Sequence, residues 1–220
     1  MRQRRLLIGL AVVLGLLAAG AYLVQPAPVP AEAIERAVTR TPALLDKAFS
    51  LPVAASFGRD ITWQSNASRC GPASVANVYR SLGEEETTEA EVLDGTGFCW
   101  TGYCIVGLTL DEVAEVAQAH TERKVTVLRD LTEDAFLEHL KRSNDPARRY
   151  TINFTRKEIF GAGAGHHSPI GGYLEEEDMV LVLDVNEAFK PWLIERKRLY
   201  DAMNTVDSDG GKKRGLLLIE

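Results

Sequence analysis

The sequence is poor in cysteine and lacks a basic patch in which aromatic side chains alternate with lysine and arginine. Its 25 Lys and Arg residues are outnumbered by 31 Asp and Glu residues, which gives a formal net charge of −6. Nucleic acid is therefore not expected as a partner. Internal repeats and long low-complexity tracts are also missing. The 220 residues are enough for one globular domain with a substantial core.

The three cysteines are Cys70, Cys99 and Cys104. In an oxidising compartment the segment FCWTGYC is consistent with a local disulfide between the last two, although the sequence alone leaves this open. A metal-binding pair is less favoured, because no second pair of ligands lies at a usual spacing, and we expect no metal site. Cys70 is then left over, and a free thiol in an exported protein calls for a reason.

Only one long hydrophobic run is present, at the N-terminus. Arginines at positions 2, 4 and 5 precede an uninterrupted apolar stretch from Leu6 to Val24. This pattern predicts a signal peptide or signal anchor over residues 1–25, with a small-residue cleavage pattern at 19–21. The positive-inside rule then places the domain outside the cytoplasm, either periplasmic or anchored to the membrane. Residues 26–34 form a predicted Pro-rich spacer, and residues 35–220 form the domain. Whether two copies make a homodimer is left open.

The remaining residues predict an α+β fold with an antiparallel sheet. Helical spacing is expected within residues 31–50 and at 71–82, 109–120 and 131–142, the third opened by a capping box from Thr109 to Glu112. Strands are expected at 124–130, 148–155, 168–174, 178–185 and 215–220, with an acidic turn joining the third and fourth. Helices come mostly first and strands mostly last, as in α+β domains.

One constellation of residues points to nucleophilic catalysis. Cys70 opens a predicted helix, where the helix dipole favours thiolate, the nucleophilic form. The predicted hairpin brings His166 opposite or nearly opposite Asp184, a carboxylate set in the apolar run VLVLDV. An unpaired charge there would be costly, so we expect the pair to act as base and orienter. Gln64, six residues before the cysteine, can donate to a developing oxyanion.

These motifs resemble two related groups of proteins. The order Gln-x5-Cys-Gly-x-Ala-Ser, Gly-His-x-Ser-Pro and Leu-Asp-Val is similar to the papain-like cysteine peptidase clan. The segments GHHSPIGGY, DMVLVLDV and AMNTVDSDGGKKRGLLLI more narrowly resemble the catalytic domain of phytochelatin synthase, over residues 48–219. The resemblance implies a papain-like fold, with the nucleophile at a helix N-terminus packed on an antiparallel sheet. It also implies Cys70 as nucleophile, His166 as base, Asp184 as orienter and Gln64 in the oxyanion hole.

The resemblance also implies residues that bind the substrate. Asn153 and Arg156 fall in an Asn-aromatic-x-Arg motif, and Arg214 falls in a near-terminal Arg-Gly motif. Arginine suits bidentate carboxylate binding, so both arginines are candidates for gripping substrate carboxylates. The chain departs from the family after Val185, where it reads NEAFKPW, and at His167, which occupies an apolar position of the motif.

The reaction implied is that of a glutathione γ-glutamylcysteinyltransferase, in heavy-metal detoxification. Cys70 would cleave the Cys–Gly amide of glutathione and form a γ-Glu-Cys thioester. Water or a second glutathione would resolve it, giving γ-glutamylcysteine or phytochelatin. The sequence stops at Glu220 without a Cys-rich extension, so we expect mainly hydrolysis. No cofactor is required for the chemistry, and heavy-metal thiolates of glutathione can serve as acceptors. The alternatives are a peptidase like the bacteriocin-processing cysteine peptidases, or a non-enzymatic thiol- or metal-binding protein.

Overall fold

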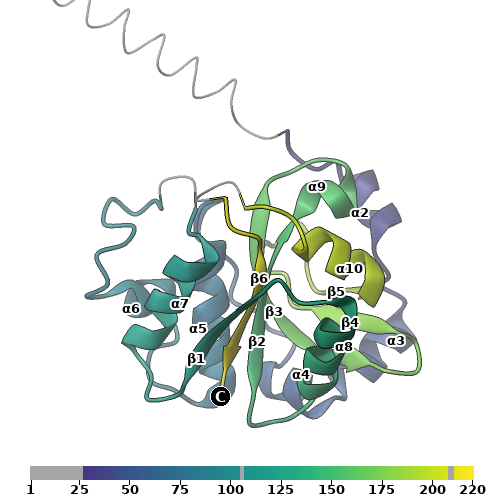
Figure 1. The fold of residues 1–220 in the computed structure, drawn as a ribbon, viewed down its shortest axis with the longest axis horizontal. Helices are drawn as coiled ribbons and strands as arrows, with labels where there is room; N and C mark the ends of the chain where they lie inside the picture. Colours follow the sequence, from purple (N-terminus) through teal and green to yellow (C-terminus); the bar gives the residue numbers. More distant parts are fainter. Residues whose placement is uncertain (1–26, 105–106, 208–210) are drawn as a thin grey trace, which may run out of the picture.

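The computed structural model describes residues 27–104, 107–207 and 211–220, drawn in colour in Figure 1. The helices are α2 (Ala31–Ala37), α3 (Pro42–Phe49), α4 (Pro52–Phe57), α5 (Cys70–Leu82), α6 (Glu89–Leu93), α7 (Leu110–Ala119), α8 (Glu133–Arg142), α9 (Arg156–Phe160) and α10 (Arg196–Met203). The strands are β1 (Val125–Arg129), β2 (Arg149–Thr155), β3 (Gly165–Leu174), β4 (Met179–Val182), β5 (Trp192–Glu195) and β6 (Gly215–Ile219).

The strands form one sheet in the order β1-β6-β2-β3-β4-β5, and all neighbouring pairs are antiparallel. β6 is the last strand of the sequence, yet it lies between β1 and β2 in the middle of the molecule (Figure 1). All five of its residues are buried, as its unbroken apolar sequence suggests. The predicted α+β class with an antiparallel sheet is confirmed.

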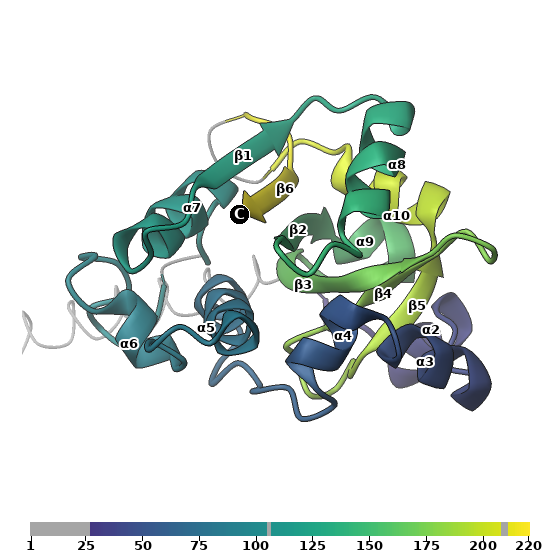
Figure 2. The same ribbon diagram turned by 90° about the horizontal axis from the view of Figure 1, so that it is seen from below.

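The two faces of the sheet carry separate hydrophobic cores. On one face, α3, α4, α5 and α7 pack against residues such as Leu181 and Leu217. On the other face, α8, α9 and α10 pack around Phe154 and Trp192. Figures 1 and 2 show α5 to α7 on one side of the sheet, away from α8 to α10. Because successive side chains of a strand point to opposite faces, the strands contribute to both cores.

Helix α5 starts and ends where its sequence predicts. Gly83 stops it in the left-handed conformation, at φ 75°. Gly71 lets its first turn approach α7, since a Cβ there would lie 2.5 Å from a methyl group of Val113. The predicted capping box of α7 is present, with Thr109 and Glu112 bonded reciprocally to each other's backbone N–H. The nucleophile candidate therefore sits at a helix start held firmly against a neighbouring helix.

The hairpin of β3 and β4 contains a change of register. Leu174 pairs with Met179 and Gly172 with Leu181, but Ile170 pairs with Val182, so β3 holds one extra residue. Gly172 has φ 146°, and a Cβ on Gly171 would lie 2.7 Å from Leu181. Glycine is required at both positions for the bulge to fit against the sheet and its neighbours.

The domain begins earlier than the sequence predicted. Residues 31–34, assigned to the spacer, belong to α2, and Ile34 is buried in the core around Trp192. The sequence patterns also missed α4, α6, α9, β5 and α10, which have four to eight residues each and therefore show little periodicity. No helix among the described residues is long and apolar enough to cross a membrane, and the run from Leu6 to Val24 lies outside them.

Candidate active site

Cys70 is the first residue of α5 and is 6% exposed. It is the free cysteine of the described chain, because Cys99 and Cys104 are joined by a disulfide. At a helix start the backbone N–H groups of the first turn carry partial positive charge, which favours an anion nearby. The sequence-based placement of the thiol at a helix start is confirmed.

The loop before Cys70 is fastened to two other segments. The backbone N–H of Ser65 donates to Glu89 at 2.9 Å, and Arg69 forms an ion pair with the same carboxylate at 3.2 Å. Asn66 donates from Nδ2 to the carbonyl of Gly102, and the Cys104 N–H donates to Ser68 Oγ, both at 3.1 Å. The disulfide-closed segment 99–104 therefore helps to hold the loop of residues 64–69 in place. This loop before Cys70 is called the nucleophile loop below.

Asp184 is fully buried and lies at the centre of a polar network. Its Oδ1 is 2.9 Å from His166 Nε2, and Arg156 Nη2 lies 2.9 and 3.0 Å from its two oxygens. The indole N–H of Trp192 and the backbone N–H of Asn186 also donate to it, at 3.2 and 2.9 Å. Burial alone would raise the pKa of Asp184, but Arg156 and His166 outweigh it and hold that pKa well below its usual range.

The same network acts on the thiol through His166. Burial alone would raise the pKa of Cys70, but the charge and hydrogen bonding of His166, and to a smaller extent a hydrogen bond from His167, hold it well below its ordinary value. Burial and the nearby Arg156 work to lower the pKa of His166, whereas Asp184 and Cys70 raise it, and the net direction is upward. These directions favour a Cys70 thiolate beside a His166 imidazolium, the reactive pair of a cysteine nucleophile.

His167 also lies against the thiol. Its Nδ1 is 3.8 Å from Cys70 Sγ, and the side chain is buried, with Nε2 unpartnered among the described residues. Sequence reasoning noted His167 only as a departure from the motif and set it aside in favour of His166. The pairing of β3 with β2 places His167 opposite Asn153, on the sheet face that α5 covers. The alternation of side chains along these two predicted strands was the signal that could have indicated this position.

Gln64 connects the nucleophile loop to the strand end that carries Asp184. Its backbone N–H donates to the carbonyl of Val185 at 2.8 Å. Its side-chain Nε2 donates to the carbonyl of Asn66 at 2.8 Å, and its Oε1 is buried without a partner in the described structure. One hydrogen of the Nε2 amide remains for another acceptor.

Two of the predicted substrate-binding residues lie together beside His166. Asn153 Nδ2 donates to Asp207 Oδ2 at 2.8 Å, and Arg214 Nη2 lies 3.0 Å from the other oxygen of that carboxylate. Arg214 Nη1 donates to Thr205 Oγ1 at 3.0 Å. A Cβ on Gly165 would lie 2.9 Å from Arg214 Nη2, so the guanidinium packs directly on the residue before His166.

Arg156 has a partner that the sequence did not suggest. Its Nη2 holds Asp184, and the guanidinium stacks on Phe189 with Cζ 3.3 Å from the ring centroid. Its Nη1 is buried and has no partner within the described residues. The predicted contact with a substrate carboxylate would therefore have to come from Nη1, while the rest of the group orients Asp184.

Buried polar atoms without a partner gather around this site. Ten such side-chain atoms occur among the described residues, and half of them belong to residues of the site. These five atoms are Gln64 Oε1, Asn153 Oδ1, Arg156 Nη1, His167 Nε2 and Arg214 Nε. Because a buried polar group without a partner is costly, their concentration in one place is consistent with a polar ligand that binds there.

Comparison with known proteins identifies the family. The phytochelatin synthase family model matches residues 24–216, nearly the whole of the chain. The chain belongs to the phytochelatin synthase family.

Relatives within this family carry one common name. A glutathione gamma-glutamylcysteinyltransferase of Schizosaccharomyces pombe is 32% identical over 117 residues, covering 52% of this chain and 28% of the relative. Glutathione gamma-glutamylcysteinyltransferase 1 of Triticum aestivum is 35% identical over 116 residues, covering 51% of this chain and 23% of the relative. Glutathione gamma-glutamylcysteinyltransferase 3 of Lotus japonicus is 42% identical over 73 residues, covering 33% of this chain and 15% of the relative. The chain thus matches less than a third of the length of these relatives.

Solved structures of low sequence identity share the fold of this phytochelatin synthase family member. The peptidase domain of Streptococcus ComA, a bifunctional ABC transporter, has a TM-score of 0.50 at 14% identity, covering 73% of this chain and 96% of that domain. A C39-like peptidase from Bacillus anthracis has a TM-score of 0.53 at 12% identity, covering 74% and 95%. The predicted papain-like peptidase fold is confirmed.

Proposed function

We propose that this protein transfers the γ-glutamylcysteinyl group of glutathione through a thioester on Cys70. The observation that carries the proposal is the hydrogen bond of His166 to Asp184 at 2.9 Å, with the same imidazole lowering the pKa of the Cys70 thiol, in a chain of the phytochelatin synthase family. The network of Asp184 fixes the imidazole, and the helix start favours thiolate.

The chemistry follows from the roles of these groups. The Cys70 thiolate attacks the carbonyl of the Cys–Gly amide, and a tetrahedral oxyanion forms beside the Gln64 amide and the backbone N–H of Cys70. The C–N bond then breaks, and the leaving glycine amine takes a proton from the His166 imidazolium. In the second step His166 removes a proton from water or from the amino group of a second glutathione. That nucleophile attacks the thioester, and the Cys70 thiolate is regenerated.

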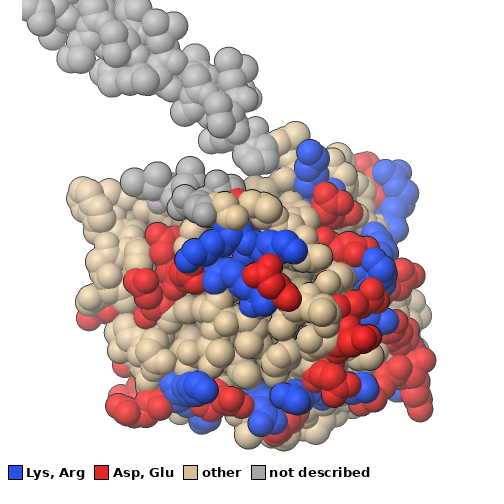
Figure 3. Space-filling view, viewed as in Figure 1, with Lys and Arg blue, Asp and Glu red and all other residues tan. Residues whose placement is uncertain are grey.

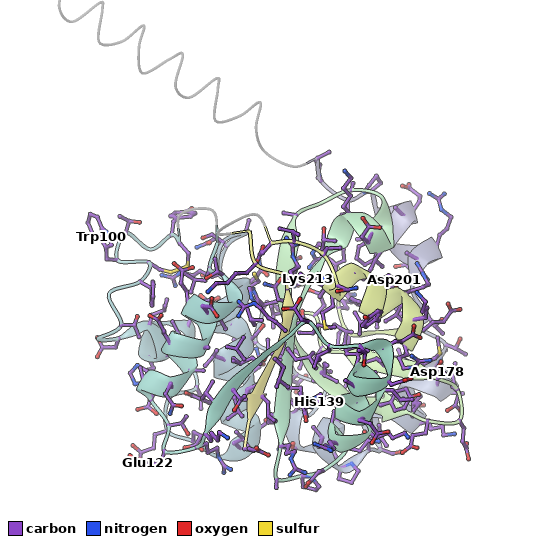
Figure 4. All side chains as sticks on the ribbon, viewed as in Figure 1. Trp100, Glu122, His139, Asp178, Asp201 and Lys213 are labelled. Atoms are coloured by element: carbon purple, nitrogen blue, oxygen red, sulfur yellow. A yellow bond between two sulfur atoms is a disulfide. The ribbon has the colours of Figure 1, made fainter. Side chains whose placement is uncertain are left out.

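Recognition of the substrate is assigned to the unpaired polar atoms around the thiol. Glutathione carries two carboxylates and one ammonium group, and Arg214 with Asp207 offers opposite charges next to Gly165. Basic side chains also gather on the surface near Arg214, where Figure 3 shows a blue cluster and Figure 4 labels Lys213. The cluster comprises Arg129, Lys212 and Lys213, close to Asp111 and Asp130. It would attract an anionic peptide in spite of the negative net charge of the chain.

A trapping experiment tests the proposal. The purified protein is mixed with glutathione, quenched in acid and analysed by intact mass and peptide mapping, while free glycine is measured. We expect a γ-glutamylcysteinyl adduct on Cys70 and glycine released, and we expect neither with Cys70→Ser, because an alcohol is a far poorer nucleophile. A Ser56→Ala variant is the matched control. Glycine release by Cys70→Ser at more than a few per cent of the normal rate would remove Cys70 from the mechanism.

Metal enters the proposal as part of an acceptor substrate. No group of three or more His, Cys, Asp or Glu residues is positioned to hold a metal ion in the described parts of the chain. Glutathione thiolates of a heavy metal would instead occupy the acceptor position. Cadmium titrated at constant free glutathione should then raise phytochelatin formation without changing the rate at which the adduct on Cys70 forms. An equal effect on both steps would contradict this assignment.

We also propose that the domain works outside the cytoplasm. The Cys99–Cys104 disulfide and the arginines before the Leu6–Val24 run support this location. Cell fractionation with a tagged full-length chain tests it, and a protein confined to the cytosolic fraction with three free thiols would refute it.

A further inference from the structure

Two adjacent histidines of one strand act on the thiol of Cys70, and only one of them has a carboxylate partner among the described residues. His166 is bonded to Asp184 through Nε2, at 2.9 Å. His167 has Nδ1 at 3.8 Å from Cys70 Sγ and an unpartnered, buried Nε2, so far as the described residues show. The roles of the two imidazoles must therefore differ.

The surroundings of His167 argue against a charged ring. An imidazolium would have to donate from both nitrogens, and its buried Nε2 hydrogen would then find no acceptor in the part of the chain that the structure describes. His166 and Arg156 already bring positive charge to the thiol, and a third cation would be repelled by both. A neutral ring with its hydrogen on Nδ1 avoids the buried N–H donor and the repulsion between cations, leaves only the weaker cost of an unpaired Nε2 acceptor, and directs an N–H group at the sulfur.

We propose that His167 is a second catalytic imidazole, which donates a hydrogen bond from Nδ1 to the Cys70 thiolate and does not carry the proton of the reaction. The bond holds the sulfur in place between the two rings before attack. It loses its anionic acceptor when the thioester forms, so its contribution belongs to the free enzyme and the first step. His166 remains the group that protonates the leaving glycine. The inference rests on the proposed role of Cys70 as nucleophile.

Alkylation of the thiol measures this contribution without glutathione. The chain has three cysteines and two are in the disulfide, so iodoacetamide reports on Cys70 alone. The second-order rate constant is measured from acid to alkaline pH on the intact oxidised protein. Other charged groups that act on the thiol are His166 from β3 and Arg156 from α9, with Asp184 behind both. Arg69, the residue before the thiol, is paired with Glu89. These groups are unchanged in the variants.

Three substitutions separate a hydrogen bond from simple packing. His167→Phe fills the space but removes the donor, so the pH midpoint of alkylation should rise by about one unit, or tenfold in rate on the acid limb. His167→Asn places an amide N–H near the position of Nδ1 and should restore the midpoint. His167→Gln places it near Nε2 and should not. Thr151→Val, a buried change on the same sheet face, is the matched control and should leave the midpoint unchanged.

The outcomes decide between the two roles. Each variant is first checked for the native far-UV spectrum and a cooperative thermal transition. An unchanged midpoint in a folded His167→Phe variant, or the same shift in His167→Phe and His167→Asn, would overturn the proposal. If the alkylation profiles follow the prediction but no γ-glutamylcysteinyl adduct forms with glutathione, the role of His167 stands and the proposed function fails.

Discussion

Arg156 Nη2 lies 2.9 and 3.0 Å from the two oxygens of Asp184, so this carboxylate is shared between a guanidinium and the His166 imidazole. The side chain of Arg156 is 7% exposed and that of Asp184 is fully buried. Removing either partner would leave the other charge in a poorly solvated place, which is costly. Asp184, the proposed orienting carboxylate, is thus also a structural element, and substitutions here should affect both turnover and stability.

Asp184→Asn should lower the rate of glycine release by about 10³- to 10⁴-fold. The amide can hold His166 in the wrong tautomer, and it no longer stabilises the imidazolium. Stopped-flow measurement of glycine release, beside equilibrium binding of glutathione, should show a loss of turnover with little loss of affinity. Asp178→Asn, a change of a partly exposed carboxylate, serves as the control. Unchanged turnover in Asp184→Asn would reduce Asp184 to a structural role.

Arg156→Met should make the protein more sensitive to acid. The folded-state pKa of Asp184 is depressed, so its stabilising contribution is present above the ordinary aspartate pKa of about 4 and is lost as pH falls through the depressed value. Without Arg156 that folded pKa rises, so the loss begins at a higher pH. Unfolding at neutral pH should also cost about 3–5 kcal/mol less.

Circular dichroism followed from neutral to low pH checks the effect of Arg156→Met. Arg148→Met is the control, because Arg148 forms more exposed ion pairs with Asp145 and Glu220. Equal acid midpoints for Arg156→Met and the unmodified protein would show that the guanidinium does not govern Asp184.

Replacing Cys99 and Cys104 by alanine should lower the free energy of unfolding by at most about 2–3 kcal/mol, because the closed loop is short. The segment also supports the nucleophile loop through Asn66 and Ser68. These bonds use a backbone carbonyl and a backbone N–H, which the substitution keeps. We therefore expect Cys70 alkylation and adduct formation to persist in the folded double variant. Loss of adduct formation there would mean that the reactive thiol has been misassigned.

Arg214→Lys should lower kcat/KM for glutathione, by an amount that corresponds to a loss of about 1–3 kcal/mol of transition-state stabilisation. Lysine keeps the charge but loses the bidentate fork of the guanidinium. Alkylation of Cys70 by a small reagent should not change, since Cys70, His166 and Asp184 are untouched. Lys197→Ala, an exposed change outside the basic cluster, is the control. Equal loss in both reactions would indicate a folding defect, and loss in neither would leave Arg214 outside substrate recognition.

The core elements of the fold could be predicted because they carry strong local signals. Residues 71–82 have helical spacing and a terminating glycine, and residues 215–220 form an unbroken apolar run. Shorter elements such as α9 and β5 lack such a signal. Phe160 of α9 packs on Trp192, and β5 is held by its pairing with β4. Helical spacing was expected within residues 31–50, where α2 lies, but residues 31–34 were assigned to the spacer, since the stretch is rich in Pro and Ala and Ile34 is held by tertiary contacts.

The placement of Cys70, His166 and Asp184, the proposed triad, was predictable, whereas their surroundings were not. A thiol at a helix start and a His–Asp pair across a hairpin follow from local pattern. The contact of Arg156 with Asp184 requires the end of β2 to approach the end of β4, which no sequence spacing specifies. The approach of His167 to the thiol likewise depends on how α5 packs against β3.

The bulge in β3 decides which of the two neighbouring histidines shares a sheet face with Asp184. If the pairing of Leu174 with Met179 and of Gly172 with Leu181 continued unshifted, Asp184 would stand opposite Pro169, on the face of His167. The extra residue moves the pairing by one, so that Ile170 meets Val182 and Asp184 turns to the face of His166. The adjacent glycines 171 and 172, which allow the bulge, thus determine which of two chemically identical side chains faces Asp184. They lie four or more residues away from both histidines in the sequence.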